Sequence, residues 1–154
     1  MNNKVKFIAW LAIMALAAAG LLAQVFPAKL CCIAGNYRGS HTSDAGPGCP
    51  PPVTETFAMT MNQGIGCSAE IWGTITDAAG VVNHFKGKLM RGPRGCCLIK
   101  GQFGAPGHVT TFTGTICKVL IQGGWKWRVT KGTAAEEYSG VGCRHTSTWE
   151  MTQI

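Results

Sequence analysis

Few side chains in this sequence could carry out acid–base chemistry or bind a metal ion, and they are widely spaced. None of the four histidines stands in an H-x-H or H-E-x-x-H pattern; they are His41, His84, His108 and His145. Metal sites built on one element need such a pair. The isolated acidic residues are Asp44, Glu55, Glu70, Asp77 and Glu150. The adjacent pair Glu136-Glu137 would face opposite ways on a strand and could not share a substrate atom.

The sequence also lacks the short motifs that position a nucleophile or a phosphate group. It contains no G-x-S-x-G, no P-loop, and no G-x-G-x-x-G after a strand. We therefore predict a protein that is not an enzyme and that has no bound metal ion and no cofactor. A small hydrolase or isomerase that uses the mouth of its fold is a weaker hypothesis. A histidine or carboxylate pair converging in a pocket would revive it.

Eight cysteines form the other chemically distinctive group, and all of them follow residue 28. They are Cys31, Cys32, Cys49, Cys67, Cys96, Cys97, Cys117 and Cys143. An even number of cysteines in an exported chain predicts up to four disulfides. No C-x-x-C spacing occurs, and adjacent cysteines on a strand point to opposite faces, so a thiolate metal site is the weaker alternative.

The amino terminus indicates where these cysteines reside. Residues 1–6 contain Lys4 and Lys6 and no acid, and residues 7–28 carry no charge. A basic start followed by an apolar run is typical of an export signal, but this run is also long enough to span a bilayer as a helix. We expect residues 1–28 to be a signal peptide or a membrane anchor. Residues 29–154 would then form one extracytoplasmic domain, whether periplasmic, secreted or anchored.

The composition favours short strands in that domain. Of the 154 residues, 46% are hydrophobic, only 14% are charged, and 21 are glycine. These values exclude a disordered tail or a charged helical rod. A glycine-rich, charge-poor chain with scattered threonine and aromatic residues is typical of β-structure.

A pattern of large apolar residue, any residue, glycine, any residue and large apolar residue recurs along the chain. Its clearest copies are Ile71–Ile75, Phe85–Leu89, Ile99–Phe103 and Phe112–Ile116. Their central glycines are 14, 14 and 13 residues apart, which fits one strand and one tight turn. Related segments are Tyr37–Gly39, Phe57–Met61, Trp125–Val129 and a partial copy at Tyr138. The alternation places the apolar residues and the glycine on one face of each strand.

Successive strands joined by tight turns pair antiparallel, so the repeat predicts an all-β, up-and-down sheet of about eight or nine short strands. Its apolar face is best buried if the sheet closes into a barrel, which also removes exposed edges. Inward glycines permit the tight coiling that closure needs. A two-sheet sandwich is the alternative, although its strand spacing is usually less uniform.

The layout of residues 33–153 resembles the small calycin barrels of the lipocalin and avidin type. Gly35-Asn36-Tyr37 is similar to their opening Gly-x-Trp, with tyrosine in place of tryptophan. No further motif of these families matches. The resemblance implies a ligand-binding cup without identifying its ligand.

The strand frame suggests one disulfide. If Gly101 and Gly114 face each other, Cys96 and Cys117 lie on the outer face of adjacent strands, one diagonal step apart. We therefore predict that these two cysteines pair.

The partners of the other six cysteines stay open. Closure of the barrel would bring Cys31 or Cys32 towards Cys143. Cys49 would tie down the proline-rich segment 46–52, whichever cysteine it pairs with. The remaining two are Cys67 and Cys97.

Two sets of side chains are candidates for binding. Trp125 and Trp127 share the predicted inward face and, with Tyr37, could form a wall for a small apolar ligand, or could fill the core at one end. Basic side chains on the other face could dock an acidic protein or lipid headgroups: Lys86, Lys88, Arg91, Arg94, Lys100, Lys126 and Arg128. The formal net charge of +7 could equally serve solubility. No recognition motif supports nucleic-acid binding.

These observations predict an exported, non-enzymatic β-barrel that acts as a binding module in the cell envelope or outside the cell. Its partner would be a protein or a small apolar ligand. The alternative is a membrane-anchored structural subunit of a larger envelope complex, held by residues 7–28. A barrel interior filled by its own side chains would favour the structural subunit.

Overall fold

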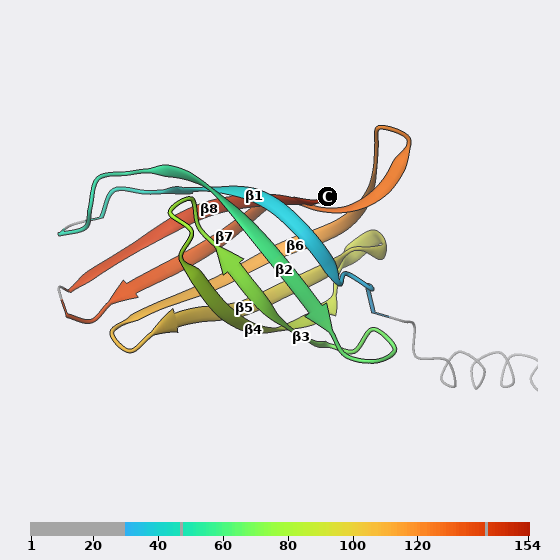
Figure 1. Ribbon diagram of the computed structural model, residues 1–154, viewed down its shortest axis with the longest axis horizontal. Coiled ribbons are helices and arrows are strands. Elements are labelled where there is room, and N and C mark those ends of the chain that lie inside the picture. The colour runs from blue at the N-terminus through green and yellow to red at the C-terminus, as the bar shows by residue number, and fades with distance from the viewer. Residues whose placement is uncertain (1–29, 47, 141) are drawn as a thin grey trace, which may run out of the picture.

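The computed structural model describes residues 30–46, 48–140 and 142–154. Their elements are β1 (Gly35–Ser43), β2 (Thr54–Gln63), β3 (Glu70–Thr76), β4 (Val82–Arg91), the short 3-10 helix η1 (Pro93–Gly95), β5 (Cys97–Ala105), β6 (His108–Ile121), β7 (Gly124–Tyr138) and β8 (Cys143–Gln153). Each strand pairs antiparallel with the next, and β8 pairs with β1, which closes the barrel (Figure 1). The barrel prediction is therefore confirmed, and the sandwich alternative is excluded. The expected hydrophobic helix within residues 1–28 lies outside the described residues.

Most copies of the repeat correspond to one strand each. Tyr37–Gly39 lies in β1, and the next five copies lie in β2 to β6 in order. The exception is β7, a 15-residue strand that contains both Trp125–Val129 and Tyr138. Because these two segments belong to one strand, the described barrel has eight strands rather than nine.

Inward glycines of one strand lie directly opposite inward aromatic residues of a neighbouring strand. The pairs are Gly39 with Phe57, Gly73 with Phe85, Gly101 with Phe112 and Gly132 with Trp149. A Cβ atom on Gly101 would lie 2.4 Å from Cζ of Phe112, and one on Gly132 would lie 2.1 Å from Cε2 of Trp149. The repeat therefore makes room for large rings inside a narrow barrel.

The segment before β1 closes one end of the barrel. Ile33 is fully buried there, and the Tyr37 hydroxyl donates a hydrogen bond to the Ile33 carbonyl. At the end of β2, the Gln63 side chain accepts a hydrogen bond from the Ile33 N–H (2.9 Å) and donates one to the Cys31 carbonyl (2.9 Å). These bonds supply polar partners to the buried backbone groups of Cys31 and Ile33.

All eight cysteines form disulfides. Cys31–Cys97, Cys32–Cys67 and Cys96–Cys117 lie at the closed end, and Cys49–Cys143 ties the β1–β2 loop to the start of β8 at the opposite end. Four disulfides are typical of an oxidising, extracytoplasmic compartment. In the part of the chain described, no helix has the length and hydropathy needed to cross a membrane.

Two of the sequence-based disulfide arguments need correction. The pair Cys96–Cys117 is the expected one, but the register assumed for it is wrong, because Gly101 lies opposite Phe112 rather than Gly114. The expected approach of Cys31 or Cys32 to Cys143 is also wrong. Since β8 runs antiparallel to β1, the start of β8 lies at the other end of the barrel.

Candidate functional site at the open end of the barrel

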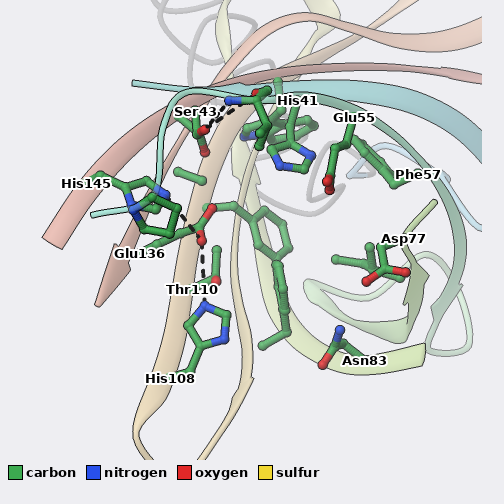
Figure 2. A pocket seen from close by; sticks show the side chains of 18 of the residues that line it. His41, Ser43, Glu55, Phe57, Asp77, Asn83, His108, Thr110, Glu136 and His145 are labelled. Atoms are coloured by element: carbon green, nitrogen blue, oxygen red, sulfur yellow. Dashed lines mark hydrogen bonds and ion pairs between the residues drawn. The ribbon is translucent and has the colours of Figure 1, made fainter. Parts of the chain in front are cut away.

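The end opposite the closed one holds a cavity of about 330 Å³. Its deeper wall is apolar and includes Phe57, Met59, Ile75, Phe103, Phe112 and Trp149. Phe112 packs edge-on against Trp149, with ring centroids 5.9 Å apart. Nearer the mouth, the lining is polar and includes His41, Glu55, Asp77, Asn83, His108, Thr110, Glu136, Tyr138, His145 and Ser147 (Figure 2). The cavity thus combines an aromatic floor with a polar rim.

A bulge in β7 aims the acidic group of this rim inward. Val129 and Gly132 both face the interior, and the register of β7 slips by one residue between them against β6 and β8. Beyond the bulge, the even-numbered positions face inward, so Glu136 and Tyr138 line the cavity while Glu137 faces outward. An extra residue in one strand shifts the alternation in this way.

Glu136 is the centre of a cluster from three strands. Its Oε2 atom lies 3.5 Å from Nε2 of His145 on β8 and 3.6 Å from Nε2 of His108 on β6. The Tyr138 hydroxyl donates a hydrogen bond of 3.1 Å to the same oxygen. Figure 2 shows Glu136 between the two histidines, with interactions drawn to both. A carboxylate and two imidazoles from three neighbouring strands therefore converge in the cavity.

Two members of this cluster are withdrawn from water, whereas the His108 side chain is 39% exposed. The side chain of Glu136 is 14% exposed and that of His145 is 8% exposed. The rings of His108 and Tyr138 stack with centroids 4.1 Å apart. Burial raises the pKa of the Tyr138 phenol, and the negative charge and the hydrogen bond of Glu136 raise it further. Tyr138 is thus held neutral as a hydrogen-bond donor.

Two buried polar atoms at the cluster make no hydrogen bond within the described residues. They are Oγ1 of Thr110 and Nε2 of His108, whose contact with Glu136 at 3.6 Å is an ion-pair distance rather than a hydrogen bond. A buried polar atom without a partner is costly. Because Thr110 and His108 both line the cavity, a polar group of a bound molecule could supply the missing hydrogen bonds.

The lining differs in charge from the rest of the protein. Three of the seven acidic residues and three of the four histidines line the cavity: Glu55, Asp77, Glu136, His41, His108 and His145. None of the described lining residues is a lysine or an arginine. The interior surface therefore favours neutral or cationic molecules over anions.

Possible metal-ligand atoms come close together at one place in the described part of the chain. Among the described residues, the one group with suitably close ligand atoms is Cys49, Cys143 and His145. Both cysteines are joined in a disulfide, so neither supplies a thiolate.

The structure does not bring the three predicted ligand-binding residues to this cavity. Tyr37 is buried in the closed end, Trp127 packs beside that core, and Trp125 is 64% exposed on the β6–β7 hairpin. Instead, the cavity is lined by histidines and carboxylates that are scattered in the sequence. The slip in β7 carries no sequence motif, and the strand pairing alone brings His108 and His145 to Glu136.

The predicted basic patch is divided between three parts of the outer surface. Lys86, Lys88 and Lys100 are exposed on β4 and β5, with Lys88 directly opposite Lys100. Lys126 and Arg128 are half-buried on β7, which β6 separates from β5. Arg91 and Arg94 are exposed beside the closed end, at the end of β4 and in η1. These side chains therefore do not form one continuous surface.

Comparison of the chain with models of known protein families gives no match, and comparison with curated proteins gives none either. Inferences about function therefore rest on the cavity and its polar cluster.

Proposed function

We propose that this protein is an extracytoplasmic, non-enzymatic binding module that holds a small molecule in the open end of its barrel. The cavity of about 330 Å³ carries the proposal, because the other end of the barrel interior is filled by its own side chains. Small-molecule sites commonly combine such a volume with an apolar wall and a few convergent polar groups. The resemblance to calycin barrels leads to the same expectation of a ligand in the interior.

The lining indicates the chemistry of the ligand. An apolar or aromatic body would lie against Phe103, Phe112 and Trp149, and a protonated amine would lie near Glu136. Glu55 and Asp77 add negative charge at the mouth, and no described lysine or arginine of the lining opposes it. A charge-assisted hydrogen bond to a half-buried carboxylate is stronger than a neutral one. The ligand class is therefore a small aromatic or alkyl amine.

Binding can be tested with three probes of equal shape. The oxidised protein is titrated with phenylbutylamine, phenylbutanol and phenylbutyrate, and the fluorescence change and calorimetric heat are recorded. We expect the amine to bind most tightly, the alcohol less tightly and the carboxylate most weakly. Replacing Glu136 with Gln should weaken amine binding by about tenfold, as expected for the loss of one charge-assisted hydrogen bond, and should leave alcohol binding nearly unchanged.

Glu137 provides a matched control. It is the next residue along β7, but it faces outward and pairs with Arg144 at 2.9 Å. Glu137→Gln removes the same charge from the protein without touching the cavity, so it should bind the amine like the wild type. Failure of all three probes to bind would contradict the binding site. Binding of the carboxylate as tightly as the amine would contradict the proposed ligand class.

The convergence of Glu136 with two histidines favours a second candidate function, acid–base catalysis on the bound molecule. Such groups transfer protons when they lie within hydrogen-bond reach of a reacting atom. Mass spectrometry of a ligand recovered after long incubation separates the two functions. An unchanged ligand supports binding alone. A chemically altered ligand, with alteration lost in Glu136→Gln, supports catalysis.

A further inference from the structure

The closed end of the barrel exposes large apolar side chains at the tips of two hairpins. Leu120 and Trp125 lie opposite each other near the tip of the β6–β7 hairpin and are 62% and 64% exposed. Ile65, in the turn between β2 and β3, is fully exposed. Figure 1 shows both hairpins at the end of the barrel where the chain enters β1. Val53, Val81, Val82 and Val109 are also exposed, toward the open end, but Ile65, Leu120 and Trp125 are larger and more exposed. Exposed large apolar side chains are typical of an interaction surface.

Basic side chains accompany these apolar residues. Lys118 and Lys126 lie on the same hairpin, and the exposed Arg94 lies in η1. By contrast, most acidic residues lie at or near the open end: Asp44, Glu55, Asp77, Glu136 and Glu137. The charges are thus distributed so that the closed end would be attracted to an anionic surface and the open end repelled by it.

The chain preceding the barrel also arrives at this end. Residues 31 and 32 are fixed there by the Cys31–Cys97 and Cys32–Cys67 disulfides. Residues 7–28, which precede them, form an uncharged apolar run long enough to cross a bilayer. If this run is retained, a short connection holds the closed end close to the membrane.

We propose that the closed end docks on a bilayer surface that contains anionic lipids. Leu120, Trp125 and Ile65 enter the interfacial region, where tryptophan is favoured, and Lys118, Lys126 and Arg94 lie at the headgroups. The barrel then stands with its open end directed away from the lipid. This proposal rests on the outer surface and is independent of what the cavity binds.

The full chain, reconstituted in vesicles, allows a direct test by hydroxyl-radical footprinting with mass spectrometry. One set of vesicles contains phosphatidylcholine alone, and the other contains one-third phosphatidylglycerol. We expect peptides with Ile65, Leu120 and Trp125 to be labelled severalfold more slowly in the anionic vesicles than in detergent. Peptides from the β3–β4 turn should be labelled at the same rate in the anionic vesicles and in detergent. High salt should restore most of the labelling.

Matched variants separate the docking surface from the anchor. Leu120→Ser with Trp125→Ser should restore labelling at Ile65, whereas Val81→Ser with Val82→Ser, which changes two exposed apolar residues at the other end, should not. Lys118→Glu with Lys126→Glu should abolish the difference between the two lipid compositions. Unprotected tips in a fully inserted protein would overturn the proposal. Equal protection in both kinds of vesicle would overturn its electrostatic part. Circular dichroism of each variant verifies that the barrel is folded.

Discussion

The closed end of the barrel has a filled apolar core and three disulfides, whereas the open end has a cavity and a single disulfide. The same strands build both ends, and the alternation of their side chains shifts between the ends at the bulge in β7. At the closed end, inward positions hold residues such as Ile99, Ile116 and Met151, which are almost completely buried. At the open end, the inward positions hold Glu136 and His145. The comparison indicates that the closed end stabilises the barrel and that the open end is available for binding.

Removing one disulfide from each end is expected to give the largest contrast. Replacing Cys31 and Cys97 with Ser should lower the free energy of unfolding by about 2–4 kcal/mol, because this disulfide holds the segment that closes the core and two buried sulfur atoms are replaced by hydroxyl groups. Replacing Cys49 and Cys143 removes a cross-link with a comparable effect on chain entropy, because the sequence separation is 94 residues against 66. It should leave the closed core intact and mainly release the β1–β2 loop, so its total cost should be smaller. Urea unfolding measures the first effect, and limited proteolysis of residues 44–53 detects the second. A larger loss of stability from the open-end pair would reverse the assignment of the two ends.

A single added methyl group should have an intermediate effect. Gly132→Ala would place a Cβ atom against the Trp149 ring, and the resulting overpacking should cost about 1–3 kcal/mol. The indole of Trp149 also donates a hydrogen bond of 3.1 Å to the Thr133 carbonyl, so the ring cannot move freely. Gly140→Ala is the control, because no atom lies within 4 Å of its Cβ position. Equal stability of the two variants in urea would contradict the glycine–aromatic packing.

The smallest expected effect concerns how much Tyr37 and Tyr138 each contribute to the loss of protein stability at alkaline pH. Burial raises the pKa of the Tyr37 phenol, and burial followed by the charge of Glu136 raises the pKa of the Tyr138 phenol. A phenol with a raised pKa in the folded state stabilises the fold below its ordinary pKa near 10, and this contribution is lost as the pH rises through the folded value. Stability should therefore fall above about pH 10.

Phenylalanine variants assign this loss to the two ends. Tyr37→Phe should remove more of the alkaline loss than Tyr138→Phe, because Tyr37 is the more deeply buried residue. At neutral pH, Tyr37→Phe should itself cost about 1 kcal/mol, since the Ile33 carbonyl loses its hydrogen-bond donor. Urea midpoints between pH 8 and 11 measure both effects, and identical pH profiles for the two variants would contradict the assignment.

The repeat allowed the barrel to be predicted from local information. A strand and a tight turn repeat in the sequence itself, so antiparallel pairing and one apolar face follow without knowledge of distant contacts. The number of strands was predicted only as eight or nine, because Trp125–Val129 and Tyr138 look like separate units although they share β7. The bulge between Val129 and Gly132 joins them while changing which positions face inward.

The candidate site could not be predicted in this way. Glu136, His108 and His145 come from three strands, and their proximity depends on the registers of β6, β7 and β8. A register change of one residue moves every side chain to the opposite face. The scattered histidines therefore gave no signal in the sequence, and the tryptophans that did give one lie at the other end of the barrel.

The sequence by itself determined the alternation, the turns, the glycine repeat and the even number of cysteines, because each of these depends on residues close together in the chain. The tertiary structure decided the disulfide partners, the filled and open ends and the Glu136 cluster. These depend on barrel closure and on one bulge, which set the distances between residues far apart in the sequence.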